Sequence, residues 1–482
     1  MTPSTKEYQA SRRRAIELKQ YLFLGFLLLI GFIGLLWFAR PKESVLEKRE
    51  LTDFPSLELS SVCDGSFFQA VDLWYSDTYP LREPLIGMNF AMQRLYGFQG
   101  EQIINGGGKA DDIPSGTVDL EALAGKNSTE APANTGSADA APAGTQASGD
   151  SGAETAAPTE TEPDGHGGAD YNGSLEKNKD GIYLANGTGY GVYYFTESTS
   201  ARYCLLVNQL AKNLEGKAQL YSLLCPISTG VMLAEERQKD IGASDENEAI
   251  QWFYRNMAPS VKTVSVFNTL RAHNDEYIFF RTDHHWTALG AYYAYQEWCK
   301  VKGVEPHALS DFETRSFEGF LGSFYSHTSQ DAAMAANPDT VIAYVPKGTN
   351  AMKMYVEQSK GVYQEFDWRI VNDVSDYVKS ELYGTFAGGD QPFNSVHNEA
   401  VTDGSSVLVV KDSFADAFIP FLIDHYEHIY WIDYRYFKGW CSWAGKPYSW
   451  ISGLVNEKGI QDVIICNNID FVGSENLLGL MK

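Results

Sequence analysis

The stretch RTDHHWTALGAYYAY, residues 281–295, places an acid, two histidines and a tryptophan between an apolar run and a tyrosine-rich segment. The preceding run, EYIFF at 276–280, predicts a strand, and the apolar residues of 287–301 recur at helical spacing. In extended backbone, residues i and i+2 point to the same side. We therefore expect Asp283 and His285 to share a side while His284 points elsewhere.

Further apolar runs extend this strand-and-helix pattern along the chain. Short strands are predicted at 219–225, 406–410, 428–432 and 462–466. Their alternation with helical segments predicts an α/β fold with a mostly parallel sheet flanked by helices. In such sheets ligands bind beyond the carboxyl ends of the strands. Residues 339–358 look instead like a hairpin, which we interpret as an insertion.

Ser413 follows the predicted strand 406–410, in VLVVKDSFADAF. If the sheet is parallel, its strand end opens on the same edge as the turn that carries Asp283 and His285. A serine hydroxyl is a poor nucleophile at neutral pH and needs a neighbouring base. A carboxylate that holds the imidazole in the correct tautomer completes such a set. The sequence therefore predicts a triad of Ser413, His285 and Asp283.

Structural roles compete with each of these assignments. Ser413 could be a helix N-cap, and a single histidine is often structural. His284 and His285 could bind a metal ion, but adjacent histidines lack the i, i+4 geometry of a helical metal site. We predict no metal and no cofactor. Asp412 either caps the following helix or positions substrate, and Arg435 either orients substrate or pairs with Asp433.

The N-terminal part of the chain predicts a membrane anchor. Residues 20–39, QYLFLGFLLLIGFIGLLWFA, carry no charge, and about 20 apolar residues span a hydrocarbon core. The basic segment 1–19 favours an N-terminus inside the cell, with everything after the single span outside it. A formal net charge of −24 argues against nucleic-acid binding.

The ectodomain divides by composition. Residues 44–100 show helical spacing and predict a helical N-terminal part. From 101 to 170 there is no aromatic residue, and Ala, Gly, Ser, Thr, Pro and acids dominate. Such a segment cannot bury enough apolar surface to fold, so 101–177 is predicted to be a disordered acidic insertion. Residues 178–482 form the predicted α/β domain.

Four elements of the chain resemble the DHHW protein family. They are the motif Asp283-His284-His285-Trp286 together with YSDTYPLREPLIGMN (75–89), KDSFADAFIPFL (411–422) and IDYRYF (432–437). That family is similar to the SGNH-hydrolase-like domains of bacterial alginate O-acetyltransferases, in which an Asp, a His and a Ser form a triad. The resemblance assigns these roles to Asp283, His285 and Ser413. Those enzymes often have glycine where this chain has Lys411.

The resemblance implies a function outside the cytoplasm. It implies a membrane-anchored O-acetyltransferase that acts on a cell-surface or secreted polysaccharide through an acyl-serine. A membrane acyl-transfer partner would supply the acetyl group. Two alternatives are an acetylester hydrolase of the same fold and a catalytically silent protein that binds glycan or serves as an envelope scaffold.

Overall fold

The computed structural model describes residues 110–124, 171–177, 181–328, 330–359 and 361–481, with a few positions between 43 and 79. The chain divides into two units, Met1–Gln99 and Gly100–Lys482. In the first, β1 (Glu43–Ser44) and β2 (Arg49–Glu50) pair antiparallel. Most of the predicted helical part at 44–100 lies outside the described residues.

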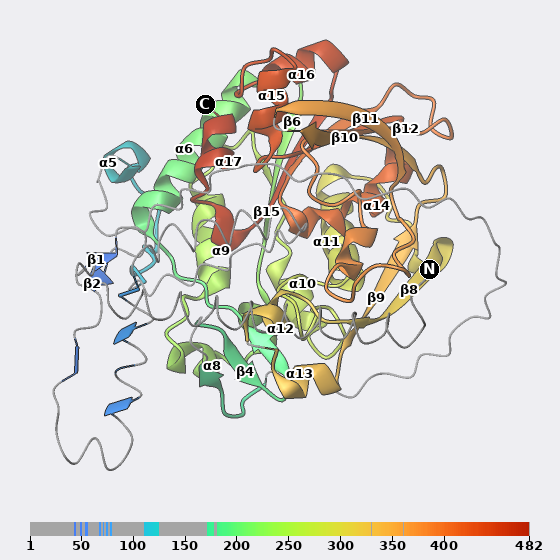
Figure 1. The fold of residues 1–482 in the computed structure, drawn as a ribbon. Coiled ribbons are helices and arrows are strands. Elements are labelled where there is room, and N and C mark those ends of the chain that lie inside the picture. Colours follow the sequence, from blue (N-terminus) through green and yellow to red (C-terminus); the bar gives the residue numbers. More distant parts are fainter. Residues whose placement is uncertain are drawn as a thin grey trace, which may run out of the picture. The chain divides into compact units, whose positions relative to one another are not determined.

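An eight-stranded sheet organises the second unit (Figure 1). Its parallel part has the order β14 (His428–Asp433), β13 (Ser406–Lys411), β15 (Asp462–Asn468), β6 (Gln219–Cys225) and β7 (Lys262–Thr263). An antiparallel extension continues from β14 through β12 (Asn394–His397), β10 (Ala351–Ser359) and β11 (Val362–Arg369). The predicted parallel sheet is therefore confirmed at its centre, and the complete sheet is mixed.

Burial explains why the central strands could be recognised and the outer ones could not. Every residue of β13 and β15 is buried, and the centre of each strand is an unbroken apolar run, 407–410 and 463–466, as expected of strands covered on both faces. In β10, buried and more exposed positions alternate over most of the strand, as expected when one face of a strand is exposed to solvent. Such a strand has a weaker apolar signal in the sequence.

Helices lie on both sides of this sheet (Figure 1). Within the described residues of the second unit, the α-helices are α5 (Leu120–Ala124), α6 (Glu197–Asn213), α7 (Ser228–Met232), α8 (Glu235–Asp240), α9 (Glu246–Arg255), α10 (Phe267–Ala272), α11 (Ala288–Lys302), α12 (Ser323–His327), α13 (Ala332–Ala336), α14 (Ile419–Leu422), α15 (Phe437–Trp443), α16 (Ile451–Lys458) and α17 (Glu475–Leu480). Short 3-10 turns are η1 (Leu309–Asp311), η2 (Leu382–Thr385), η3 (Ser413–Asp416), η4 (Ile423–His425) and η5 (Ile469–Phe471).

Helix α11 matches the helix predicted after the DHHW motif. The Thr287 hydroxyl accepts from the Gly290 backbone N–H at its start. The helix ends at Gly303, whose φ of 83° lies in the left-handed region that glycine tolerates. At Gly290 a Cβ atom would lie 2.4 Å from the Ile278 carbonyl oxygen, so glycine is needed where the helix meets the preceding loop.

Two strand predictions are wrong. Residues 276–280 form no strand, because Phe279 folds back to make an isolated bridge with Trp286 instead of joining the sheet. The segment 339–358 is not one hairpin. Its first half is β9 (Asp339–Val345), which pairs with β8 (Glu313–Phe320), whereas β10 pairs with β11.

Parts of the expected insertion 101–177 contact the α/β domain. The Val118 N–H donates to the Asn256 side-chain oxygen at 3.0 Å, and Leu123 is buried. Tyr171 forms a bridge with Leu233. Strand β3 (Glu176–Lys177) joins β4 (Tyr183–Ala185) and β5 (Thr188–Tyr190) in a small sheet. The domain therefore includes residues that composition alone assigned to the insertion.

Among the residues that the structure describes, no helix has both the length and the apolarity to cross a membrane. The predicted anchor at 20–39 and the tail at 1–19 lie outside those residues.

Candidate active site

The DHHW motif lies on a tight loop between Ile278 and Thr287. Two backbone hydrogen bonds close the loop, from the Thr287 N–H to the Ile278 carbonyl at 2.9 Å and from the Phe280 N–H to the His285 carbonyl at 3.2 Å. The buried Asp339 carboxylate holds it from outside by accepting from the Thr282 backbone N–H at 2.7 Å and the Thr282 hydroxyl at 2.6 Å. These hydrogen bonds hold the backbone of the loop that carries residues 283–285.

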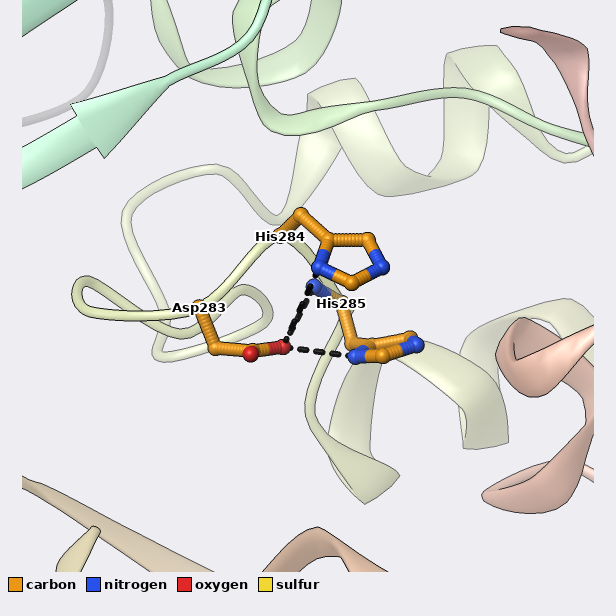
Figure 2. A group of neighbouring side chains, drawn as sticks. All are labelled: Asp283, His284 and His285. Atoms are coloured by element: carbon orange, nitrogen blue, oxygen red, sulfur yellow. Dashed lines mark hydrogen bonds and ion pairs between the residues drawn. The ribbon is translucent and has the colours of Figure 1, made fainter. Parts of the chain in front are cut away.

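Within that loop the Asp283 carboxylate faces the His285 ring (Figure 2). Its Oδ1 accepts from the His285 Nδ1 at 2.6 Å and from the His285 backbone N–H at 3.0 Å. Its Oδ2 accepts from the Ser323 backbone N–H at 2.7 Å. At the adjacent Gly322 a Cβ atom would lie 2.3 Å from that oxygen, so the carboxylate is clamped where a larger residue cannot fit.

Ser413 reaches the same point from the end of β13, 128 residues further along the chain. Its Oγ lies 2.6 Å from His285 Nε2, within hydrogen-bond distance. The predicted convergence of Asp283, His285 and Ser413 is thus present in the structure. All three residues are buried, with Ser413 5% exposed.

Asp412, and not Ser413, caps the turn that follows β13. Its Oδ1 accepts from the Phe414 N–H at 3.0 Å, and its Oδ2 accepts from the Asn468 N–H at 2.8 Å. The Tyr434 hydroxyl also donates to Oδ2 at 3.2 Å. Asp412 therefore has the capping role that the sequence left open, and its oxygens are taken by protein donors. The alternative reading of Ser413 as an N-cap is wrong.

Burial and charge set the protonation of the pair. Burial lowers the pKa of His285 to about 4, with His284 adding to the shift and Asp283 opposing it. Burial alone would raise the pKa of Asp283, but the facing imidazoles and hydrogen bonds outweigh it and hold that pKa well below its usual range. At neutral pH the imidazole is therefore uncharged beside an ionised carboxylate, the state that a general base requires.

His284 lies against the triad and does not point away from it, contrary to expectation. Its ring centroid is 3.9 Å from that of His285, and its Nδ1 lies 2.6 Å from the Ser323 hydroxyl oxygen. Asp283, His284 and His285 are close enough together to be considered as metal ligands. The 2.6 Å from Asp283 Oδ1 to His285 Nδ1 is a hydrogen-bond distance, shorter than the roughly 3.3 Å between two ligands of one tetrahedral zinc ion. The arrangement fits a hydrogen-bonded triad better than a metal centre.

Tyr383 is a member of the site that the sequence analysis missed. Its ring stacks on His285 with centroids 4.0 Å apart and an angle of 11° between the planes. Its hydroxyl donates to the Ser413 carbonyl at 2.9 Å. Tyr383 lies in η2, in a segment without a recognisable motif, so no signal in the sequence could have indicated it.

Lys411 lies at the end of β13 and is completely buried. Its Nζ is 2.6 Å from an Asp416 oxygen, 3.2 Å from Asp433 and 3.7 Å from Asp390. Burial would lower the pKa of Lys411, but these carboxylates reverse the effect and raise it. Because Asp416 belongs to η3, the lysine ties the serine turn to the sheet. This role accounts for a buried lysine at this position.

Arg435 is engaged by the same carboxylates. Its guanidinium bonds Asp433 at 2.6 Å and 2.9 Å and Asp390 at 2.5 Å. The pairing of Arg435 with Asp433 is present. Together these side chains form an ion cluster of Lys411, Arg435, Asp390, Asp416 and Asp433.

The structure thus defines the chain as a mixed α/β protein with a hydrogen-bonded Ser-His-Asp set at the end of β13. A family model described as "DHHW protein" matches residues 47–432. The chain belongs to the DHHW protein family.

The chain is similar to several solved structures. A DHHW family protein from Eubacterium siraeum is 28% identical with a TM-score of 0.53, covering 62% of this chain and 93% of its own. Bacillus cereus PatB1 is 18% identical with a TM-score of 0.51, covering 61% of this chain and 98% of its own. The O-acetyltransferase domain of Pseudomonas putida AlgJ is 13% identical, covering 63% and 93%, but its TM-score is only 0.35. No curated protein sequence matches the chain.

Proposed function

We propose that this protein is a serine-dependent O-acetyltransferase that modifies a cell-surface or secreted polysaccharide outside the cytoplasm. The observation that carries the proposal is the continuous path of hydrogen bonds from Asp283 through His285 to Ser413. Acetyl transfer and a polysaccharide acceptor rest on the resemblance of the D-x-H-W and D-S-F elements to O-acetyltransferase domains.

In the first half-reaction His285 Nε2 accepts the Ser413 proton while Oγ attacks the acyl carbon of the donor. The resulting tetrahedral intermediate expels the donor's leaving group, which takes that proton from His285. The product is an acetyl ester on Ser413. Asp283 stabilises the transient imidazolium without itself taking a proton.

In the second half-reaction a sugar hydroxyl gives its proton to His285 Nε2 and its oxygen attacks the acetyl-serine carbon. The Ser413 oxygen leaves and recovers the proton from His285, which regenerates the enzyme. A membrane acyl-transfer partner is the proposed donor, and the predicted N-terminal anchor would hold the protein beside it. If water replaces the sugar, the same residues perform acetylester hydrolysis, which is the second candidate function.

The test uses the full chain with 4-nitrophenyl acetate as an activated donor. We expect release of 4-nitrophenolate and an acetyl group on the peptide that contains Ser413. The Ser413→Ala variant should lose both. Ser442→Ala, a change to an exposed serine in α15, should retain both. Equal turnover by Ser413→Ala and wild type would contradict the nucleophile assignment.

Adding glycan to the assay then distinguishes acetyl transfer from ester hydrolysis. Acetylated glycan as the product supports transfer, and free acetate in its presence supports hydrolysis. A folded protein that neither turns over the ester nor reacts with a serine-directed phosphonate would favour the silent scaffold.

A further inference from the structure

Three side chains of types that ligate metal ions lie close together at the opposite ends of the strands from Ser413. His397 is the last residue of β12, and His428, the first residue of β14, is its direct partner in the antiparallel register. The two rings stack with centroids 4.8 Å apart. Glu427 precedes His428. Because Ser413 follows the carboxyl end of β13, and β13 and β14 run parallel, this group is separated from Ser413 by the length of the strands.

The distances between the possible ligand atoms of this group are longer than the hydrogen bonds of the triad. Glu427 Oε1 lies 3.7 Å from His397 Nε2 and 3.6 Å from His428 Nε2, too long for hydrogen bonds. All three ligand atoms lie within 4.8 Å of one another. Two ligands at zinc distances of about 2.0–2.1 Å in tetrahedral geometry are roughly 3.3 Å apart. Small side-chain movements would therefore bring all three atoms onto one ion.

The carboxylate is held in the orientation that such a site needs. Glu427 Oε2 accepts from the Gly404 N–H at 2.8 Å, which turns Oε1 toward the imidazoles. The Glu427 backbone is fixed on both sides, since its N–H donates to the Ser405 hydroxyl at 3.2 Å and its carbonyl accepts from the Asn398 N–H at 2.8 Å. Hydrogen bonds of this kind, which orient a ligand from behind, are typical of metal sites.

We propose that His397, Glu427 and His428 bind a divalent transition-metal ion of the zinc class. The ligands would be the two Nε2 atoms and Oε1, with water completing the coordination. Imidazole and carboxylate form a donor set that suits Zn²⁺. The side chains of His397, Glu427 and His428 are 55%, 21% and 37% exposed, so the ion can enter from solvent. A bound ion would cross-link β12 to β14 beside the loop 398–405, which connects β12 to β13.

Isothermal titration of the full chain with Zn²⁺ tests the proposal. The protein is prepared without a polyhistidine tag, and a chelator first removes any bound metal ions. We expect wild type to bind one ion at this site. His428→Ala and Glu427→Gln should each weaken that binding by at least about tenfold. Zn²⁺ should also raise the thermal unfolding midpoint of wild type more than that of either variant.

Two matched controls keep the result specific. His273 lies 2.7 Å from Glu276 at similar exposure, but only one histidine takes part, so His273→Ala should leave the affinity unchanged. His284→Ala removes a possible ligand beside the triad and should also leave it unchanged. Undetectable binding, equal affinity in wild type and His428→Ala, or loss of binding in His284→Ala would each overturn the proposal. None of these outcomes depends on acetyl transfer.

Discussion

Replacing Lys411 by methionine tests whether the ion cluster supports the serine turn. At an effective dielectric constant of about 20, an ammonium 2.6 Å from Asp416 and 3.2 Å from Asp433 is attracted by roughly 6 and 5 kcal/mol. The desolvation of the buried ammonium offsets several kcal/mol of this attraction. Methionine fills a similar volume but leaves Asp416, which is 2% exposed, without its cation.

The size of the loss is limited by proton uptake. Burial raises the pKa of Asp416 and Lys411 opposes that shift, so removing the lysine raises the pKa further and the carboxyl can take up a proton instead of remaining an unpaired buried charge. Asp433 retains Arg435 as its partner. We therefore expect the loss typical of a broken buried ion pair, about 3–5 kcal/mol in the free energy of unfolding.

Urea unfolding, followed by tryptophan fluorescence, measures the change as a lower midpoint. Lys353→Met is the matched control. Lys353 also faces two carboxylates, each at 3.1 Å, but its side chain is 54% exposed. We expect no resolvable change there, because exposed ion pairs contribute little. A Lys411→Met midpoint equal to that of Lys353→Met would refute the argument.

Three further predictions concern the triad itself. Asp283→Asn should lower ester turnover by about 10³–10⁴ with the fold retained, because one amide oxygen cannot accept from both His285 Nδ1 and the Ser323 N–H; turnover within tenfold of wild type would exclude this role for the carboxylate. Because burial lowers the pKa of His285 to about 4, turnover should stay level as the pH falls from about 8 to 5 and then decline as the base becomes protonated; an apparent pKa near that of free imidazole in the pH profile would contradict this. Tyr383→Phe keeps the stacked ring but removes the hydrogen bond to the Ser413 carbonyl, so kcat should fall by about tenfold with KM unchanged; a change in KM alone would point to substrate contact instead.

The parts of the fold that sequence predicted correctly are those with an unambiguous apolar signal. The strand at 219–225 and the cores of β13, β14 and β15 are recognisable because strands that are largely buried contain continuous apolar runs. The run 276–280 has the same signal, but its residues fold back toward Trp286. An apolar run reveals burial, and it does not reveal which backbone it will pair with.

Some residues of the candidate site could likewise be predicted from the sequence, and others could not. Ser413 could be predicted because it follows the buried strand β13. Asp283 and His285 could be predicted from the i, i+2 spacing of an acid and a histidine, although the strand expected before them is not formed. Tyr383 and the His397–His428 pair could not, since their positions depend on tertiary packing and on strand register. Lys411 illustrates the same limit, because its three carboxylate partners come from separate segments.

The position of β15 has a consequence for how the protein is made. This strand is the last of the large sheet in the chain, yet it lies between β13 and β6 and joins the early part of the sheet to the late part. It also supplies the Asn468 amide that holds Asp412 beside the nucleophile. During synthesis the β6–β7 part and the β13–β14 part of the sheet can join only after residues 462–468 have emerged, so the turn at Ser413 gains its support from Asn468 later than the turn itself is made.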